Sequence, residues 1–298
     1  MKSKSEKWKS GFILFYMFLC IIPVILFFLF ILCNSFLSSY EFIKTYGMIE
    51  HGNRISQYAQ LSLLPEKFSF EQYIGAFWES SDFWYYFWNS VGISGFIAVG
   101  TVVVSTGGAY ALSKLHFPGK RLVLLSVILI MMLPYQIMLA PQMMMMDKIG
   151  LLNHNASVIL PNIFTTFGVY LLYQFMQNIP KECLEAAQMD GAGHIHIFFK
   201  IVLPQVKDGI SALLILNLID TWNLVEQPLL FLENQYQYPL SVILSEGETL
   251  IENHVFACCV IFVIPILLVF LACKDSLLNG ISSSVLNIEK IALEKVEK

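Results

Sequence analysis

Charged residues are scarce in this sequence. Only 13% of its 298 residues are Asp, Glu, Lys or Arg, which is about half the fraction of an ordinary soluble domain. Hydrophobic residues make up 56% of the chain, and the mean hydropathy is +0.65. A chain of this composition could not cover its own surface with polar groups in water, so the sequence indicates a membrane protein.

Features of several other protein classes are missing. The net charge is −4 and no basic tract is interleaved with aromatic residues, which argues against a nucleic-acid partner. The six cysteines form no Cys-x-x-Cys pair, and five lie in or beside apolar runs. They are therefore interpreted as small buried apolar residues rather than as a disulfide framework or a zinc site.

The sequence also lacks an active site. Gly119-Lys120 resembles the end of a phosphate-binding loop, but that motif requires a glycine five residues earlier, where Lys114 stands. No other catalytic constellation is visible, so we predict no enzymatic activity and no cofactor bound by this chain. Met143–Met146 would point all round a helix, and His194 and His196 would not share a helical face. We therefore predict no metal site.

Long apolar runs are present instead, and about 20 apolar residues suffice for one helix to cross a bilayer. The first run carries no charge, and it is too long for a signal peptide core. We therefore predict an all-α polytopic membrane protein with six transmembrane helices. The predicted spans are 11–33, 90–112, 122–139, 157–176, 209–230 and 255–273.

The basic residues indicate the sidedness of these spans. If the N-terminus is cytoplasmic, 14 of the 18 Lys and Arg residues fall in the cytoplasmic segments and 4 in the outer ones. The positive-inside rule then predicts that both termini are cytoplasmic. The outer segment 34–89 ends in a run of aromatic residues, which favours a position along the membrane–water interface, although a binding platform for a partner is an alternative.

The cytoplasmic segment between the fourth and fifth spans has a regular pattern. Pro180 suits the first turn of a helix, and Gly191 and Gly193 mark its end. Phe198, Ile201 and Val202 then give the apolar face of a second short helix, predicted to end at Pro204. The pattern predicts two short helices around a glycine turn at the cytoplasmic face.

This segment resembles the E-A-A-x-x-D-G-A-x(5)-F-x-x-I-x-L-P loop of bacterial binding-protein-dependent ABC importer permeases, which have the MetI-like type I fold. Ten positions match: Glu185, Ala186, Ala187, Asp190, Gly191, Ala192, Phe198, Ile201, Leu203 and Pro204. The resemblance implies that the first short helix docks into a cleft on a separate ATPase. There Glu185 would meet a basic group and Gly191 would permit the close turn.

Weaker matches continue along the chain and are similar to the smaller permease of maltose-type carbohydrate importers. They include Phe87–Ser90, Ala109–Arg121, Trp222-Asn223 and Ile264-Pro265. The resemblance implies import of a sugar or oligosaccharide across the bacterial inner membrane. It also implies four partners: a second homologous permease, two ABC ATPase copies that use ATP, and an extracytoplasmic solute-binding protein.

The sequence departs from that family in two places. Leu224 stands where an acidic residue usually follows the Trp-Asn pair, and the C-terminal tail lacks the family pattern after Gly280. The predicted organisation is a tail (1–10), a first helix (11–33), the outer segment (34–89), a five-helix core (90–275) containing the coupling loop 177–207, and a second tail (276–298).

Polar residues mark the fifth span. If it is one helix, Asn217, Asp220, Asn223 and Gln227 share a stripe. The stripe is interpreted either as a lining for the substrate pathway or as hydrogen-bonding glue between helices. One alternative function is that of a permease in the same kind of ABC importer with a different cargo: a peptide, a polyol phosphate or an anion. A secondary transporter is another, but it would show inverted repeats, and none is visible.

Overall fold

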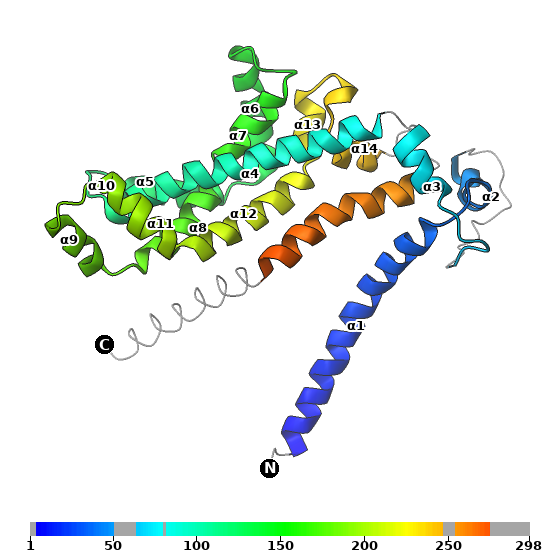
Figure 1. Cartoon of the computed structure of the whole chain (residues 1–298), viewed down its shortest axis with the longest axis horizontal. Helices are drawn as coiled ribbons and strands as arrows, with labels where there is room; N and C mark the ends of the chain where they lie inside the picture. The colour runs from blue at the N-terminus through cyan, green and yellow to red at the C-terminus, as the bar shows by residue number, and fades with distance from the viewer. Residues whose placement is uncertain (1–3, 51–63, 80–81, 247–253, 275–298) are drawn as a thin grey trace. The chain divides into compact units, whose positions relative to one another are not determined.

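The structure is a computed structural model, and it describes residues 4–50, 64–79, 82–246 and 254–274 (Figure 1). These residues form helices and connecting turns, and no strand occurs among them. The chain divides into two compact units. The first comprises residues 1–84 and 246–264, and the second comprises 85–245 and 265–298. The second of the two predicted tails, 276–298, lies outside the described residues.

Four of the described helical segments are long and apolar enough to cross a membrane: Ile13–Asn34, Phe83–Lys114, Asn155–Gln177 and Val255–Lys274. Two further pairs of helices meet the same criteria but are sharply bent. Lys120–Met131 and Tyr135–Lys148 meet at 107°, and His194–Gln205 and Lys207–Trp222 meet at 74°. Counted with each bent pair as one span, the described residues hold up to six spans, which is the number that the sequence predicts.

The boundaries of three spans differ from the prediction. The second span is α4 (Phe83–Lys114), which begins seven residues before the predicted Ser90. The aromatic run therefore lies in the first turns of this helix. The third span is divided into α5 (Lys120–Met131) and α6 (Tyr135–Lys148). Pro134 has extended backbone angles and caps α6, as expected of a residue that has no N–H and disfavours helix before it.

The prediction of one continuous fifth helix over 209–230 is wrong. α12 (Lys207–Trp222) ends before Asn223, and a separate short helix, α13 (Glu226–Phe231), follows. At this end the amide of Asn223 donates to the carbonyl of Ile219 (2.7 Å), and the hydroxyl of Thr221 donates to that of Asn217 (2.8 Å). Side chains that bond to nearby backbone compete with helix continuation.

The first unit contains α1 (Lys4–Asn34), α2 (Ser39–Glu50), α3 (Glu71–Ile74) and a π turn, η1 (Gly75–Glu79). Its hydrogen bonds centre on Asn34, which is buried at the end of the first span. The Tyr46 hydroxyl donates to the Asn34 side chain, and the Gln72 amide donates to its backbone carbonyl, both over 2.8 Å. The segment after the first span is therefore folded back onto the end of that span.

In the second unit, α4 packs closely against the fourth span, which consists of α7 (Asn155–Ile163) and α8 (Thr166–Gln177). A Cβ atom on Gly100 would lie 2.7 Å from Ile163, and one on Gly108 would lie 3.4 Å from Val169. α4 carries three further glycines. Gly92, Gly95 and Gly107 have no such neighbour within 4 Å.

The rest of the second unit is made of short helices around α12. α8 packs against both α5 and α12. Figure 1 shows α9 and α10 at one end of this unit and α13 and α14 away from that end. The remaining elements are α9 (Lys181–Met189), α10 (His194–Ile197), the π turn η2 (Phe198–Val202), α11 (Leu203–Gln205), the 3₁₀ turn η3 (Gln235–Gln237) and α14 (Leu240–Glu246).

Candidate functional site

The helix α9 and the turn after it form a self-contained unit. Pro180 precedes the helix at its N-cap, and Gly191 follows it with a φ of +84°. The N–H of Ala192 donates to the carbonyl of Ala187 (2.9 Å), and that of Gly191 donates to the carbonyl of Gln188 (3.0 Å). This pair of bonds is a Schellman motif, in which a left-handed glycine closes the helix. The predicted glycine turn is therefore present.

The ten residues of the matched motif divide between two faces. Glu185, Ala186, Asp190, Gly191 and Pro204 are exposed, whereas the other five are half-buried. Of the half-buried residues, Ala187, Ala192, Phe198 and Ile201 pack on a buried apolar cluster. That cluster joins α9 and α10 to α4, α8 and α12, with these members: Ala109, Tyr110, Leu172, Met176, Ile179, Leu184, Ile197, Val202, Val206 and Leu213.

The exposed face of the turn is open and partly apolar. Met189 and Ile195 have 87% and 76% of their surface exposed. Between α9 and α10 lies a hollow of about 490 Å³, whose wall includes Asp190, Gly191 and His196.

The second arm of the segment is less regular than predicted. It runs through α10, the π turn η2 and α11, and it ends at Gln205 rather than at Pro204. Pro204 has no N–H with which to continue the ordinary helical bonding pattern, and the π turn directly precedes its short helix. The arm then meets α12 at 74°.

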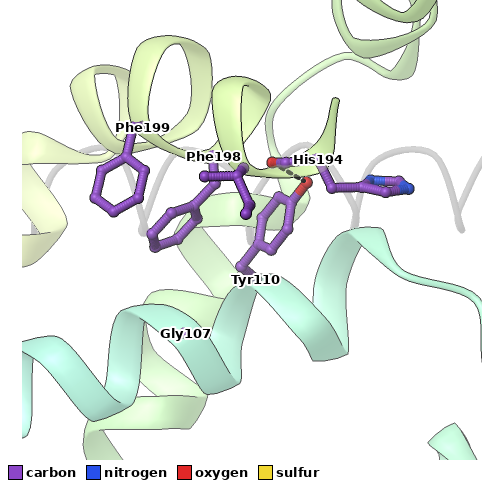
Figure 2. A pocket seen from close by; sticks show the side chains of 6 residues that line it. Gly107, Tyr110, His194, Phe198 and Phe199 are labelled. Atoms are coloured by element: carbon purple, nitrogen blue, oxygen red, sulfur yellow. Dashed lines mark hydrogen bonds between the residues drawn. The ribbon is translucent and has the colours of Figure 1, made fainter. Parts of the chain in front are cut away.

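Two side chains of α4 bind the backbone of this segment. The Lys114 ammonium donates to the carbonyl of Ile179 over 2.9 Å. The Tyr110 hydroxyl donates to the carbonyl of His194 over 3.3 Å, as the dashed line in Figure 2 shows. Neither residue was predicted to contact this segment, although their spacing of four at the end of an apolar helix places both on one face.

A small apolar pocket of about 200 Å³ lies beside this contact, between α4 and the second arm. Figure 2 shows Tyr110 rising from α4 toward Phe198 and the backbone of His194, with Gly107 one turn earlier on α4. The rings of Tyr110 and Phe198 are 5.0 Å apart. The pocket is open because Gly107 has no side chain and no neighbour within 4 Å of its Cβ position.

The four polar residues predicted to share a stripe do not all lie together. Asp220 and Asn223 are exposed on the side of α12 that also carries Leu216. Asn217 is half-buried, and its side-chain oxygen has no hydrogen-bond partner among the described residues. Gln227 is on α13 and fully buried, so it belongs to a different environment.

Gln227 is the centre of a polar network that the sequence did not predict. Its side-chain oxygen accepts hydrogen bonds from Tyr135 (3.0 Å) and from the amide of Asn162, and its own amide donates to Gln142 (3.4 Å). Thr101 of α4 donates to the carbonyl of Asn162 (3.2 Å). The network joins α6, α7 and α13 by hydrogen bonds. Hydrogen bonding between helices is one of the two roles considered for the stripe of polar residues.

Metal-ligating side chains do not gather anywhere in the part of the chain that the structure describes, since no three His, Cys, Asp or Glu residues form a group there. Met146 is buried, whereas Met144 and Met145 are exposed. The methionine run of α6 therefore spreads its side chains over different faces of the helix.

The chain belongs to the family of binding-protein-dependent transport system inner membrane components, whose model matches residues 104–282. The matched region includes the α9–α11 segment and α12. The family predicted from the sequence is thus confirmed, and with it the polytopic membrane class. A crystal structure of a bacterial ABC transporter involved in import of the acidic polysaccharide alginate has the same fold, with a TM-score of 0.77 at 21% identity, over 92% of this chain and 98% of that one.

The chain is similar to permeases of three transport systems. The arabinooligosaccharides transport system permease protein AraQ of Halalkalibacterium halodurans is 31% identical, over 73% of this chain and 79% of its own length. The diacetylchitobiose uptake system permease protein NgcG of Streptomyces coelicolor is 28% identical over 74% of each chain. The sn-glycerol-3-phosphate transport system permease protein UgpE of Yersinia enterocolitica is 30% identical, over 69% of this chain and 75% of its own.

Proposed function

We propose that this chain is the permease subunit of an ATP-binding cassette importer and forms half of a translocation pathway for a sugar or oligosaccharide. In this proposal α9 and the Gly191 turn dock on a separate ATPase, which supplies the energy from ATP. The partners are a second homologous permease, two ATPase copies and an extracytoplasmic solute-binding protein. Both termini and the α9–α11 segment lie in the cytoplasm of a bacterial cell.

The observation that carries the coupling role is the geometry of α9. Its packed face is fixed to the transmembrane helices through a buried cluster, while Glu185, Asp190 and Gly191 remain exposed. A helix that is anchored on one side and open on the other can transmit force between a partner and the membrane. The charge distribution supports the cytoplasmic position, because 14 of 18 basic residues fall on that side.

The cargo is inferred from relatives and from the chemistry of α12. Two of the relatives are permeases of oligosaccharide transport systems. Asp220 and Asn223 supply exposed polar groups on a membrane helix, where a carboxylate facing lipid would cost about 2.5–3.5 kcal/mol on insertion scales. We therefore place them along a watery path or against the second permease, where hydroxyl-rich solutes can exchange hydrogen bonds with them.

A second candidate cargo is a polyol phosphate. It is favoured by the similarity to the sn-glycerol-3-phosphate permease, which is 30% identical to this chain. The two cargo classes share the same coupling machinery, so they differ only in the solute that the assembled importer accepts.

Co-purification tests the docking role. The chain is co-expressed with the ATPase and the second permease encoded nearest to its gene, and the complex is recovered through a tag on the ATPase. We expect Glu185→Lys to lower recovery of this chain at least about tenfold, because a new positive charge would face the basic group expected in the ATPase cleft. Glu182→Lys is the matched control, since it places the same charge one turn earlier on the exposed side of α9.

Equal recovery of the two variants would contradict the docking role of Glu185. Gly191→Trp is the stronger second test, because it places bulk where the turn is exposed and its φ is positive. If that variant also recovered the ATPase normally, the α9 turn would not be the docking site.

Uptake by cells that carry the assembled importer identifies the cargo. The probes are radiolabelled arabinotriose, diacetylchitobiose and sn-glycerol-3-phosphate, each with and without the solute-binding protein. We expect ATP-dependent accumulation of one of the two sugars. Accumulation of sn-glycerol-3-phosphate alone would select the polyol phosphate cargo instead.

A further inference from the structure

The two hydrogen bonds from α4 reach both ends of the docking helix and its turn. Lys114 binds the carbonyl of Ile179, which comes immediately before the N-cap of α9. Tyr110 binds the carbonyl of His194, which is the first residue of α10 after the turn. Because Tyr110 and Lys114 are four residues apart on one helix, the whole stretch from Pro180 to Gly193 is held between two points of a single rigid element.

Packing supports both points. Tyr110 is 9% exposed, and its ring lies 5.0 Å from that of Phe198 in the second arm (Figure 2). Its neighbour Ala109 is fully buried in the cluster that also contains Leu184 of α9. The hydrogen bonds are therefore formed at the edge of an apolar contact that already restricts sliding between α4 and the segment.

The acceptors are backbone carbonyls, which has a mechanical consequence. A backbone carbonyl has no rotamers, so each acceptor follows the chain segment that carries it, which is the bend before α9 for Ile179 and the first turn of α10 for His194. Displacing α9 along or away from the membrane would stretch the bond from Lys114 at one end and the bond from Tyr110 at the other. Rotation of α9 about one of these two contacts would still stretch the hydrogen bond at the other contact.

The opposite end of α4 is tied to another loop of the second unit. The side-chain amide of Asn89 donates to the carbonyl of Tyr236 (2.7 Å), and the hydroxyl of Ser90 accepts from the N–H of Leu240 (2.8 Å). These bonds connect α4 to η3 and α14. A displacement that enters α4 at Tyr110 and Lys114 therefore reaches the η3–α14 loop without passing through α12.

We propose that Tyr110 and Lys114 are positioning residues that make α4 move together with the docking helix α9, so that ATP-driven motion is delivered to the η3–α14 loop at the far end of α4. The proposal rests on the proposed function, because it needs the ATPase to act on α9. It assigns to α4 a transmission role that is separate from the polar face of α12.

The test follows α4 in the complete transporter. The six native cysteines are replaced, and a nitroxide label is attached at Val103→Cys, a site on α4 that is 65% exposed. The purified complex with its ATPase is trapped with ATP and vanadate, and the change in the label's spectrum is recorded. We expect the combined variant Tyr110→Phe with Lys114→Met to reduce the spectral change by at least about fivefold, while the amount of trapped nucleotide stays the same.

Two further variants make the result specific. Lys120→Met is the matched control, because Lys120 also binds backbone carbonyls but binds those of Ser113 and Leu115 at the end of α4 itself. It should leave the spectral change intact. Lys114→Arg keeps a hydrogen-bond donor at the same place. With Tyr110 unchanged, this variant should show the full spectral change of the wild-type chain.

The outcomes separate the transmission role from the docking role. If the wild-type chain does not recover the ATPase, the proposed function fails. If it does, the inference is overturned by an unchanged response in the combined variant, by an equal loss in Lys120→Met, or by a wild-type label that does not respond to trapping.

Discussion

Two of the breaks between helices in the second unit, those after α9 and after α12, are stabilised in different ways. The break after α9 is closed by its own backbone, with Ala192 and Gly191 donating to carbonyls of the same helix. The break after α12 has local bonds from Asn223 and Thr221, and it is also bound by residues from elsewhere in the chain. Ser241 donates to the carbonyl of Leu224 (2.7 Å), and Gln227 bonds with residues of α6 and α7.

This difference indicates which property of the protein a substitution at each break should change. A turn that satisfies its own hydrogen bonds can stand exposed at the surface of the molecule, free to meet a partner. A break whose polar groups are satisfied by remote helices depends on the whole bundle and in turn helps to hold it together. Substitutions at the first break should therefore change binding, and those at the second should change folding.

The largest expected effect is at Gln227. Gln227→Leu removes the acceptor that the half-buried side chains of Tyr135 and Asn162 share, and the loss of these bonds should lower the free energy of unfolding by about 2 kcal/mol. Thermal unfolding of the purified protein in detergent measures the loss. Gln188→Leu, on the exposed side of α9, is the control. If the two variants had the same midpoint temperature of unfolding, the two breaks would not differ in their contribution to stability.

A smaller effect is expected at Gly191. Gly191→Ala must place a Cβ in the left-handed region, at a cost of about 1–2 kcal/mol; Gly191→Asn should cost less because Asn tolerates that region. Gly193→Ala is the control, since Gly193 has a φ of −73° and open space around it. The same unfolding measurement compares the three. Equal losses at positions 191 and 193 would show that the turn does not depend on its left-handed residue.

The smallest effect on stability is expected on the exposed face of α12. Asp220→Ala combined with Asn223→Ala should change the free energy of unfolding by about 0.5 kcal/mol or less. Uptake of the cargo identified by the probe panel should nevertheless fall severalfold. Asp208→Asn in the first turn of α12 serves as the control. Uptake kinetics that are unchanged in the double variant would exclude these residues from the pathway.

Local sequence predicted the coupling segment well and for a physical reason. A proline at the N-cap and a glycine at the left-handed position both act within one turn of their own location. The same is true of the six apolar runs, since hydropathy over about 20 residues needs no knowledge of neighbours. These features could be predicted because the interactions that determine them are short in sequence.

The rest could not be predicted from the residues near it. Gln227 fits the helical spacing of the α12 stripe, and only its bonds to residues 65 and 92 positions away place it on a separate helix. Lys114 looked like a basic residue at a membrane boundary, whereas its partner is a carbonyl 65 residues later. In both cases the deciding contact is made across the bundle, where a spacing rule carries no information.

The exposure of Met189 and Ile195 beside the Gly191 turn distinguishes an orphan subunit from an assembled one. Each side chain would gain roughly 1.5–3 kcal/mol if a partner covered it completely. If the segment is cytoplasmic, as proposed, both side chains would until then present to the cytosol an apolar surface of the kind by which quality-control proteases and chaperones select unassembled proteins. The element proposed to receive force from the ATPase would thus also report whether the ATPase has arrived, so an excess of this chain over its partners should be short-lived in the cell.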